Sequence, residues 1–102
     1  MQFELLFKVL DGKTVVAHGT GCTLGISSKS VLFRPVETLE SIKPGKFVEL
    51  SINWPVRLGY ETPLRLVTFG RVIRSMGHSA ACAIDRHEFR TQARVHQMPR
   101  MS

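Results

Sequence analysis

Several residue types that mark whole classes of protein are scarce in this sequence. Its two cysteines, Cys22 and Cys82, are isolated in strand-like runs without metal-ligand spacing, which predicts two buried thiols rather than a disulfide or a zinc site. No stretch approaches the roughly eighteen apolar residues that a membrane helix needs. The first residues contain no basic segment followed by an apolar core, so we expect a soluble, cytoplasmic protein rather than a secreted one.

Groups that carry catalysis are sparse as well. The eight acidic residues are scattered singly, so no paired-carboxylate site is predicted. His18 precedes Cys22 by four residues, but on a strand this spacing separates them by about 13 Å, too far to share one zinc ion. Gly25-Ile26-Ser27 lacks the second glycine of a nucleophile elbow. We therefore expect a protein that is not an enzyme and holds no metal or cofactor.

The chain is basic and has an ordinary apolar content. Fourteen lysines and arginines against eight acidic residues give a net charge of +6, which favours an anionic partner or a solvated basic surface. A hydrophobic fraction of 43% over 102 residues is sufficient for one core. Residues 1–102 are predicted to form a single domain.

Alternation of apolar and polar residues predicts strands along most of the chain. In residues 3–9 every second residue is apolar, and Asp11-Gly12 then marks a hairpin turn. Gly19 and Gly21 predict a bulge or bend in the returning strand, and Pro55 is expected to interrupt a later one. The predicted strands cover about residues 3–9, 14–24, 31–33, 47–54, 64–75 and 80–85.

Six short strands separated by turns predict an all-β fold, either a six-stranded antiparallel β-barrel or a sandwich. Residues 86–98 contain helix formers with little apolar periodicity, so a short C-terminal helix or a frayed tail is expected there. If this segment is helical, Arg86, Arg90 and Arg94 share one face. They would then form either a phosphate-binding site or a solvated basic surface.

The order of these pieces resembles the PilZ family of cyclic di-GMP receptors. A first hairpin is followed by the polar turn in residues 24–33, by Pro44-Gly45, by the run in residues 70–74 and by a final small-residue strand. The resemblance covers most of the chain and implies a PilZ-type antiparallel barrel. In that family cyclic di-GMP lies between an Arg-x-x-x-Arg segment before the first strand and an Asp/Asn-x-Ser-x-x-Gly turn after the second. Planar arginine forks match the phosphate and purine acceptors of this ligand.

The ligand turn of that family matches only in part. Its acidic or amide position falls on Gly25, its serine on Ser27 and its glycine on Ser30, while Ser28 lies between them in the same candidate ligand turn. Only Ser27 matches, and no arginine precedes Arg34. The resemblance therefore implies a bacterial signalling or adaptor domain that acts through an unidentified protein partner and binds cyclic di-GMP weakly or not at all.

Two other functions stay open at this stage. One is a working cyclic di-GMP receptor that uses the C-terminal arginines in place of the missing motif. The other is a small basic barrel that binds nucleic acid through Arg65, Arg71 and Arg74, with Phe69 and Trp54 as stacking residues. We favour the second least, because Trp54, its best stacking residue, alternates with core residues and is expected to pack inside.

Overall fold

The computed structural model describes residues 2–37, 40–58 and 62–91, and within these ranges all helical or strand structure is β. The strands are β1 (Glu4–Asp11), β2 (Thr14–Ile26), β3 (Ser30–Pro35), β4 (Phe47–Leu58), β5 (Thr62–Ser75) and β6 (Ala80–Thr91). The predicted all-β class is confirmed.

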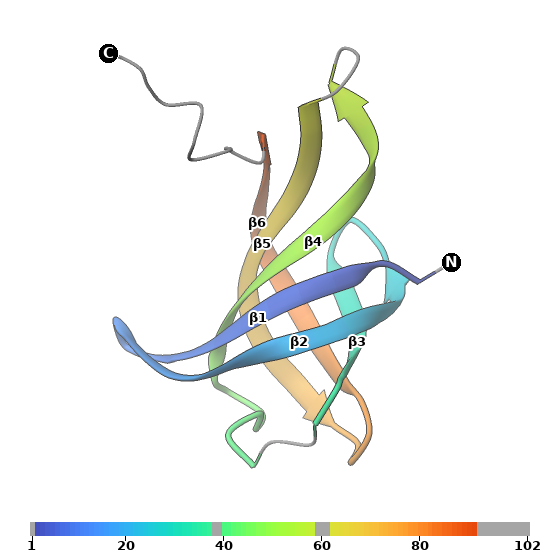
Figure 1. The fold of residues 1–102 in the computed structure, drawn as a ribbon. Helices are drawn as coiled ribbons and strands as arrows, with labels where there is room; N and C mark the ends of the chain where they lie inside the picture. Colours follow the sequence, from blue (N-terminus) through green and yellow to red (C-terminus); the bar gives the residue numbers. More distant parts are fainter. Residues whose placement is uncertain (1, 38–39, 59–61, 92–102) are drawn as a thin grey trace.

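These strands form one antiparallel sheet that closes into a ring (Figure 1). Their order around the ring is β1-β2-β3-β6-β5-β4, and closure comes from β1 pairing with β4 between Leu5↔Ile52 and Leu10↔Phe47. β4, β5 and β6 are long, and Figure 1 shows that they continue as a ribbon beyond the part of the ring that β1 to β3 complete. Closure pairs most strand edges, which would otherwise be open to other chains.

Alternate residues of each strand fill the interior of the ring. In β1, Leu5, Phe7 and Val9 are buried and the residues between them are exposed, as the period-two pattern predicts. The ring of Phe7 lies 5.5 Å from that of Phe33 in β3, so aromatic packing ties these two strands together. The buried core consists of Leu5, Phe7, Val9, Val31, Phe33, Ile42, Val48, Leu50, Ile52, Leu66, Val72, Ala80 and Cys82.

Two of the predicted turns depend on glycine. Gly12 has a φ angle of 65° between β1 and β2, and Gly45 has a φ angle of 93° just before β4. Residues with a Cβ rarely adopt this region of backbone space. The turns predicted at Asp11-Gly12 and Pro44-Gly45 are therefore confirmed.

The bulge predicted at Gly19 and Gly21 is wrong in position. The extra residue near the end of β2 is Leu24, where the register against β3 shifts. At Gly21 the two strands instead approach closely, and a Cβ would lie 2.4 Å from the carbonyl oxygen of Arg34. Glycine is therefore needed at position 21 for space.

The interruption predicted at Pro55 is also wrong, since β4 continues to Leu58 with a register shift against β5 between Trp54 and Arg57. On its other side, β4 pairs with β1 only as far as Ile52. Pro55 therefore lies on an unpaired edge, where its missing N–H is tolerated.

The last strand is longer than expected. β6 runs on to Thr91, so both alternatives expected for this segment, a short helix and a frayed tail, are wrong for residues 86–91, and Arg94 lies outside the described residues. The register between β5 and β6 shifts at Asp85, which is the extra residue of a bulge. This bulge moves the inward face of β6 from the even-numbered Ile84 to the odd-numbered His87 and Phe89.

Candidate functional site

The connection between β2 and β3 is the serine turn (residues 25–30), which holds the predicted ligand residues. The backbone N–H of Ser27 donates to the Ser30 carbonyl at 2.8 Å. The Ser27 hydroxyl accepts the N–H groups of Ser30 at 3.1 Å and Lys29 at 3.3 Å, and it lies 3.0 Å from the Ser30 hydroxyl. Ser27 is thus engaged in closing the turn, as serine often is.

The other two motif positions of the serine turn have different surroundings. A Cβ at Gly25 would meet nothing within 4 Å, and the φ angle there is not in the left-handed region. Gly25 could therefore accept a side chain without strain. Ser30 is the first residue of β3 and pairs with Ala83, so this turn needs no left-handed residue where the PilZ motif has glycine.

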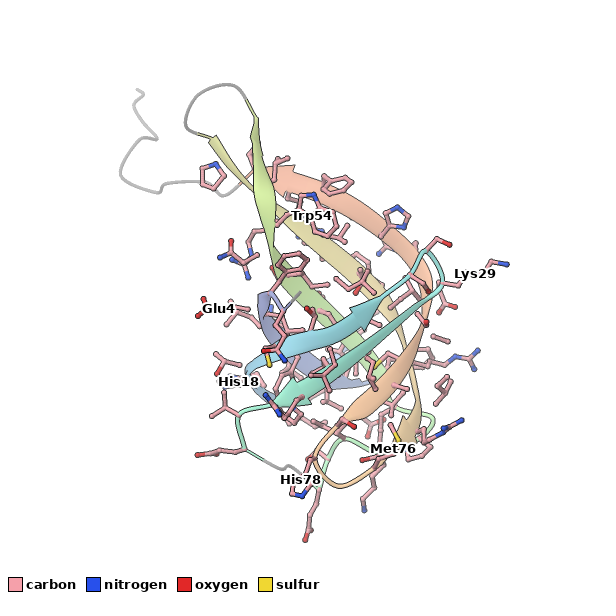
Figure 2. All side chains as sticks on the ribbon, turned by 90° about the vertical axis from the view of Figure 1, so that its right-hand side faces the viewer. Glu4, His18, Lys29, Trp54, Met76 and His78 are labelled. Carbon is pink, nitrogen blue, oxygen red and sulfur yellow. The ribbon has the colours of Figure 1, made fainter. Side chains whose placement is uncertain are left out.

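Beside the serine turn, the ring opens into an apolar mouth pocket of about 330 Å³. The ring of Trp54 lies 5.7 Å from that of Phe3 and 5.6 Å from that of Phe89, so three strand regions contribute one aromatic cluster. Figure 2 shows Trp54 toward the end of the ring that carries Lys29, opposite Met76 and His78. The pocket is lined by Ile26, Ser27, Ser28, Val31, Trp54, Leu66, Thr68, Ile84, His87 and Phe89.

The floor of the mouth pocket contains an unusual polar group. Thr68 is 3% exposed, and its hydroxyl has no hydrogen-bond partner among the described residues. Burying a hydroxyl without a partner costs roughly 1–3 kcal/mol. The pocket therefore combines an apolar wall with one unsatisfied polar atom beneath it.

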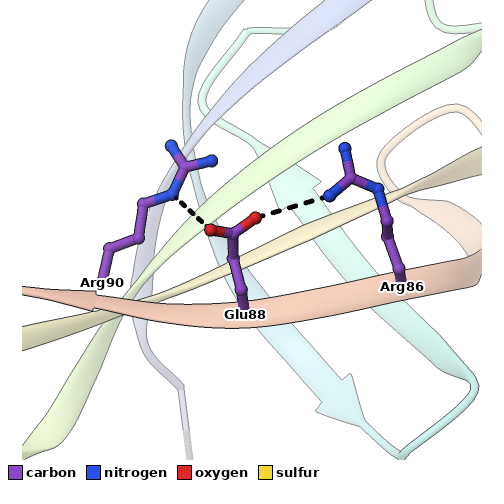
Figure 3. Close-up of polar contacts among 3 residues, drawn as sticks. All are labelled: Arg86, Glu88 and Arg90. Carbon is purple, nitrogen blue, oxygen red and sulfur yellow. Dashed lines mark hydrogen bonds and ion pairs between the residues drawn. The ribbon is translucent and has the colours of Figure 1, made fainter.

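Charged residues occupy the opposite, outer face of β6 (Figure 3). Glu88 accepts from Arg90 Nε at 3.0 Å and from Arg86 Nη1 at 3.4 Å. The Arg86 guanidinium lies 3.9 Å from the centroid of the Phe69 ring, a cation–π contact. The hydrogen bond from Arg90, together with the charges of both arginines, lowers the pKa of Glu88, while the bond to Glu88 raises the pKa of Arg90. The two arginines share Glu88 on this face, and Glu49 of β4 also acts on the charge of Arg90.

The structure brings part of the predicted site together. Ser28 and Lys29 of the serine turn line one shallow depression of about 680 Å³ with Asp85, Arg86 and His87 of β6. The Ile84 N–H donates to the Lys29 carbonyl at 2.8 Å and fixes this neighbourhood. Arg86 and Arg90 do share a face, but on a strand rather than on the expected helix.

Among the residues considered for nucleic-acid binding, Phe69 lies beneath the Arg86 guanidinium on the outer face of the sheet, while Arg65 and Trp54 pack elsewhere. Arg65 donates to the backbone carbonyl of Ser51 at 2.7 Å and also contacts its hydroxyl, so its guanidinium is held against β4. Trp54 packs against the core, which confirms the packing expected for it. Arg71 and Arg74 are exposed.

Trp54, Phe89, Thr68 and His87 belong to the pocket but were not among the site residues predicted from the sequence. Trp54 could have been found from its alternation, since it follows three core positions at period two. His87 and Phe89 could not, because the bulge at Asp85 breaks the pattern that would place them inside.

The cysteines form no disulfide, as expected, but only Cys82 is buried, while Cys22 is half-buried. Burial raises the pKa of Cys82 to about 12, which makes its thiol a poor nucleophile. In the part of the chain that the structure describes, no three histidine, cysteine or acidic side chains are grouped to hold a metal ion. Residues 2–37, 40–58 and 62–91 also contain no helix that could cross a bilayer.

In comparisons with known proteins, the chain matches no protein-family model, no curated protein and no solved structure.

Proposed function

We propose that this chain is a PilZ-like signalling or adaptor domain of the bacterial cytoplasm, which acts through a protein partner and binds cyclic di-GMP weakly or not at all. The engagement of Ser27 carries this proposal. The one residue that matches the family's ligand turn is already bonded within the serine turn, and Gly25 offers no side chain to a guanine edge. Both features weaken a nucleotide site while leaving the fold intact.

The mouth pocket supports a protein partner. Phe89 is 53% exposed although it lies against Trp54, so a large aromatic surface faces solvent next to a hollow. Exposed aromatic side chains beside pockets are typical anchors of protein interfaces. The charged outer face of β6 would supply a polar rim to such an interface.

The nucleotide half of the proposal is tested by calorimetric titration with cyclic di-GMP. We expect the wild-type protein to bind with a dissociation constant weaker than about 100 µM. Gly25→Asp restores the carboxylate of the family motif in open space, and we expect it to tighten binding, whereas the matched control Gly25→Ala should not. Sub-micromolar binding by the wild-type chain would refute this half of the proposal.

The partner half is tested by affinity capture with two matched surface variants. Phe89→Asp and Ile73→Asp each place a carboxylate at an apolar residue, and the two side chains are 53% and 55% exposed. We expect Phe89→Asp to lose the captured partner and Ile73→Asp to keep it, with both proteins folded by circular dichroism. Equal capture of the partner by both variants would show that the mouth pocket is not part of the interface.

A second candidate, a receptor that uses a different arginine set, is favoured by the depression that joins Ser28 and Lys29 to Arg86. It predicts saturable cyclic di-GMP binding by the wild-type chain. This binding should weaken in Arg86→Ala but not in the exposed control Arg71→Ala. An equal effect of both substitutions would indicate non-specific attraction to the positive chain.

A further inference from the structure

Within the described part of the chain, one side of β6 pairs with no strand beyond the point where β3 stops. The β3–β6 ladder ends at Ser30↔Ala83, and after the bond from Ile84 to the Lys29 carbonyl, β6 pairs only with β5 as far as Thr91. We call residues 85–91 the β6 edge. Among the described residues no strand pairs with its free side, so alternate backbone N–H and C=O groups there face outward.

The two faces beside the β6 edge differ in chemistry. His87 and Phe89 line the mouth pocket on the inner side, and Arg86 and Arg90 lie on the outer side. Both arginines share Glu88, and Glu49 of β4 also acts on the charge of Arg90, but their side chains stay 66% and 51% exposed and accessible to a partner. The side chains of a strand added along this edge would alternate between the apolar mouth pocket and the exposed guanidinium groups of Arg86 and Arg90.

We propose that the β6 edge binds an extended peptide segment of the partner as an added strand, with apolar side chains directed into the mouth pocket and acidic side chains beside Arg86 and Arg90. This inference rests on the proposed function and names the partner's binding segment. Backbone hydrogen bonds supply affinity in this mode of recognition, and pockets for alternate side chains supply specificity. The mouth pocket, at about 330 Å³, has room for a leucine- or phenylalanine-sized side chain.

The β6 edge is better suited to this role than the other open edge at the same end. β4 is unpaired with β1 beyond Ile52, but Pro55 lies on that edge and lacks the N–H that an added strand would use. Residues 85–91 contain no proline.

The test uses three short synthetic peptides and backbone NMR of the whole chain. The first alternates phenylalanine or valine with glutamate, the second has the same composition without alternation, and the third replaces each glutamate by lysine. We expect saturable shifts and slowed hydrogen exchange at the amides of residues 85–91 with the first peptide, and binding at least tenfold weaker with the other two. No binding of the first peptide at about 1 mM would overturn the proposal.

Charge reversal makes the test specific. Arg86→Glu combined with Arg90→Glu should reverse the preference, so that the lysine peptide binds more tightly than the glutamate peptide. Unchanged preference in this folded variant would overturn the proposed orientation of the added strand. If the peptides fail while capture of a partner still depends on Phe89, the adaptor function stands and only this mode of docking is wrong. If capture is independent of Phe89 as well, the proposed adaptor surface is itself refuted.

Discussion

Replacing Gly70 by alanine should strongly destabilise the fold. A Cβ at this position would lie 1.8 Å from the Ala83 carbonyl oxygen and 3.0 Å from the Ile84 Cα. Both are backbone atoms of β6 next to the bulge at Asp85, so relief requires the strands to separate. Overpacking commonly costs about 1–3 kcal/mol, and contact with backbone places this substitution near 3 kcal/mol. For a domain of this size that free energy lowers the Tm by roughly 12–24 °C.

The assay is thermal and urea unfolding followed by circular dichroism, with Gly25→Ala as the matched control. A Cβ at Gly25 meets nothing within 4 Å, so its effect should stay within about 0.5 kcal/mol. An unchanged slope of unfolding free energy against urea would show that the fold itself is retained. If Gly70→Ala proves as stable as Gly25→Ala, the close approach of β5 and β6 described above is incorrect.

Three further substitutions or titrations test the core and the charged face. Phe33→Ala should cost roughly 3–5 kcal/mol in urea unfolding, because this ring is fully buried; a loss below about 1 kcal/mol would contradict that burial. A thiol reagent should modify Cys22 quickly and Cys82, with its pKa raised to about 12, only on unfolding; two fast thiols would contradict this. The Glu88 carboxyl should titrate below its ordinary pKa of 4.5 by NMR and move upward in Arg90→Ala, and an unshifted midpoint would exclude the ion pairs.

The lowered pKa of Glu88 also determines how the stability of the fold depends on pH. Since the folded-state pKa lies below the unfolded one, the stabilisation from these ion pairs is fully present above the ordinary pKa. It is lost as the pH falls through the lowered pKa. At neutral pH the contribution is therefore intact, and a stability change confined to the acidic range is expected.

Most of the fold could be predicted because alternation and burial agree wherever strands are regular. The pattern in residues 3–9 places Leu5, Phe7 and Val9 inside, and the structure has them buried. The failures occur where a strand is irregular. Pro55 lies on an edge that only the ring topology reveals. In β6 the bulge at Asp85 shifts the inward positions from even-numbered to odd-numbered residues, so the alternation that would predict a strand is broken.

The candidate site was predictable only in its local part. Ser27 and Ser28 could be placed in a polar turn from neighbouring residues alone. The mouth pocket requires β4 and β6 to meet the end of β2, and these contacts join residues about sixty apart in sequence, such as Ile26 and Phe89. No single stretch of sequence contains such a juxtaposition, because it depends on how the ring closes.

The bulge at Asp85 also indicates where the chain can tolerate a change in length. Because Asp85 is an extra residue, its deletion would leave Ile84 facing inward, Arg86 outward and Phe89 inward, as they are now. Deleting Cys82 instead would move the side chains on one side of the deletion to the opposite face of the sheet. Either core residues would then face solvent or charged residues would face the core. Variation by one residue should therefore be tolerated at Asp85 and rejected elsewhere in β6. A library of single-residue deletions in β6, sorted for folded protein, would measure at each position whether the fold survives the deletion.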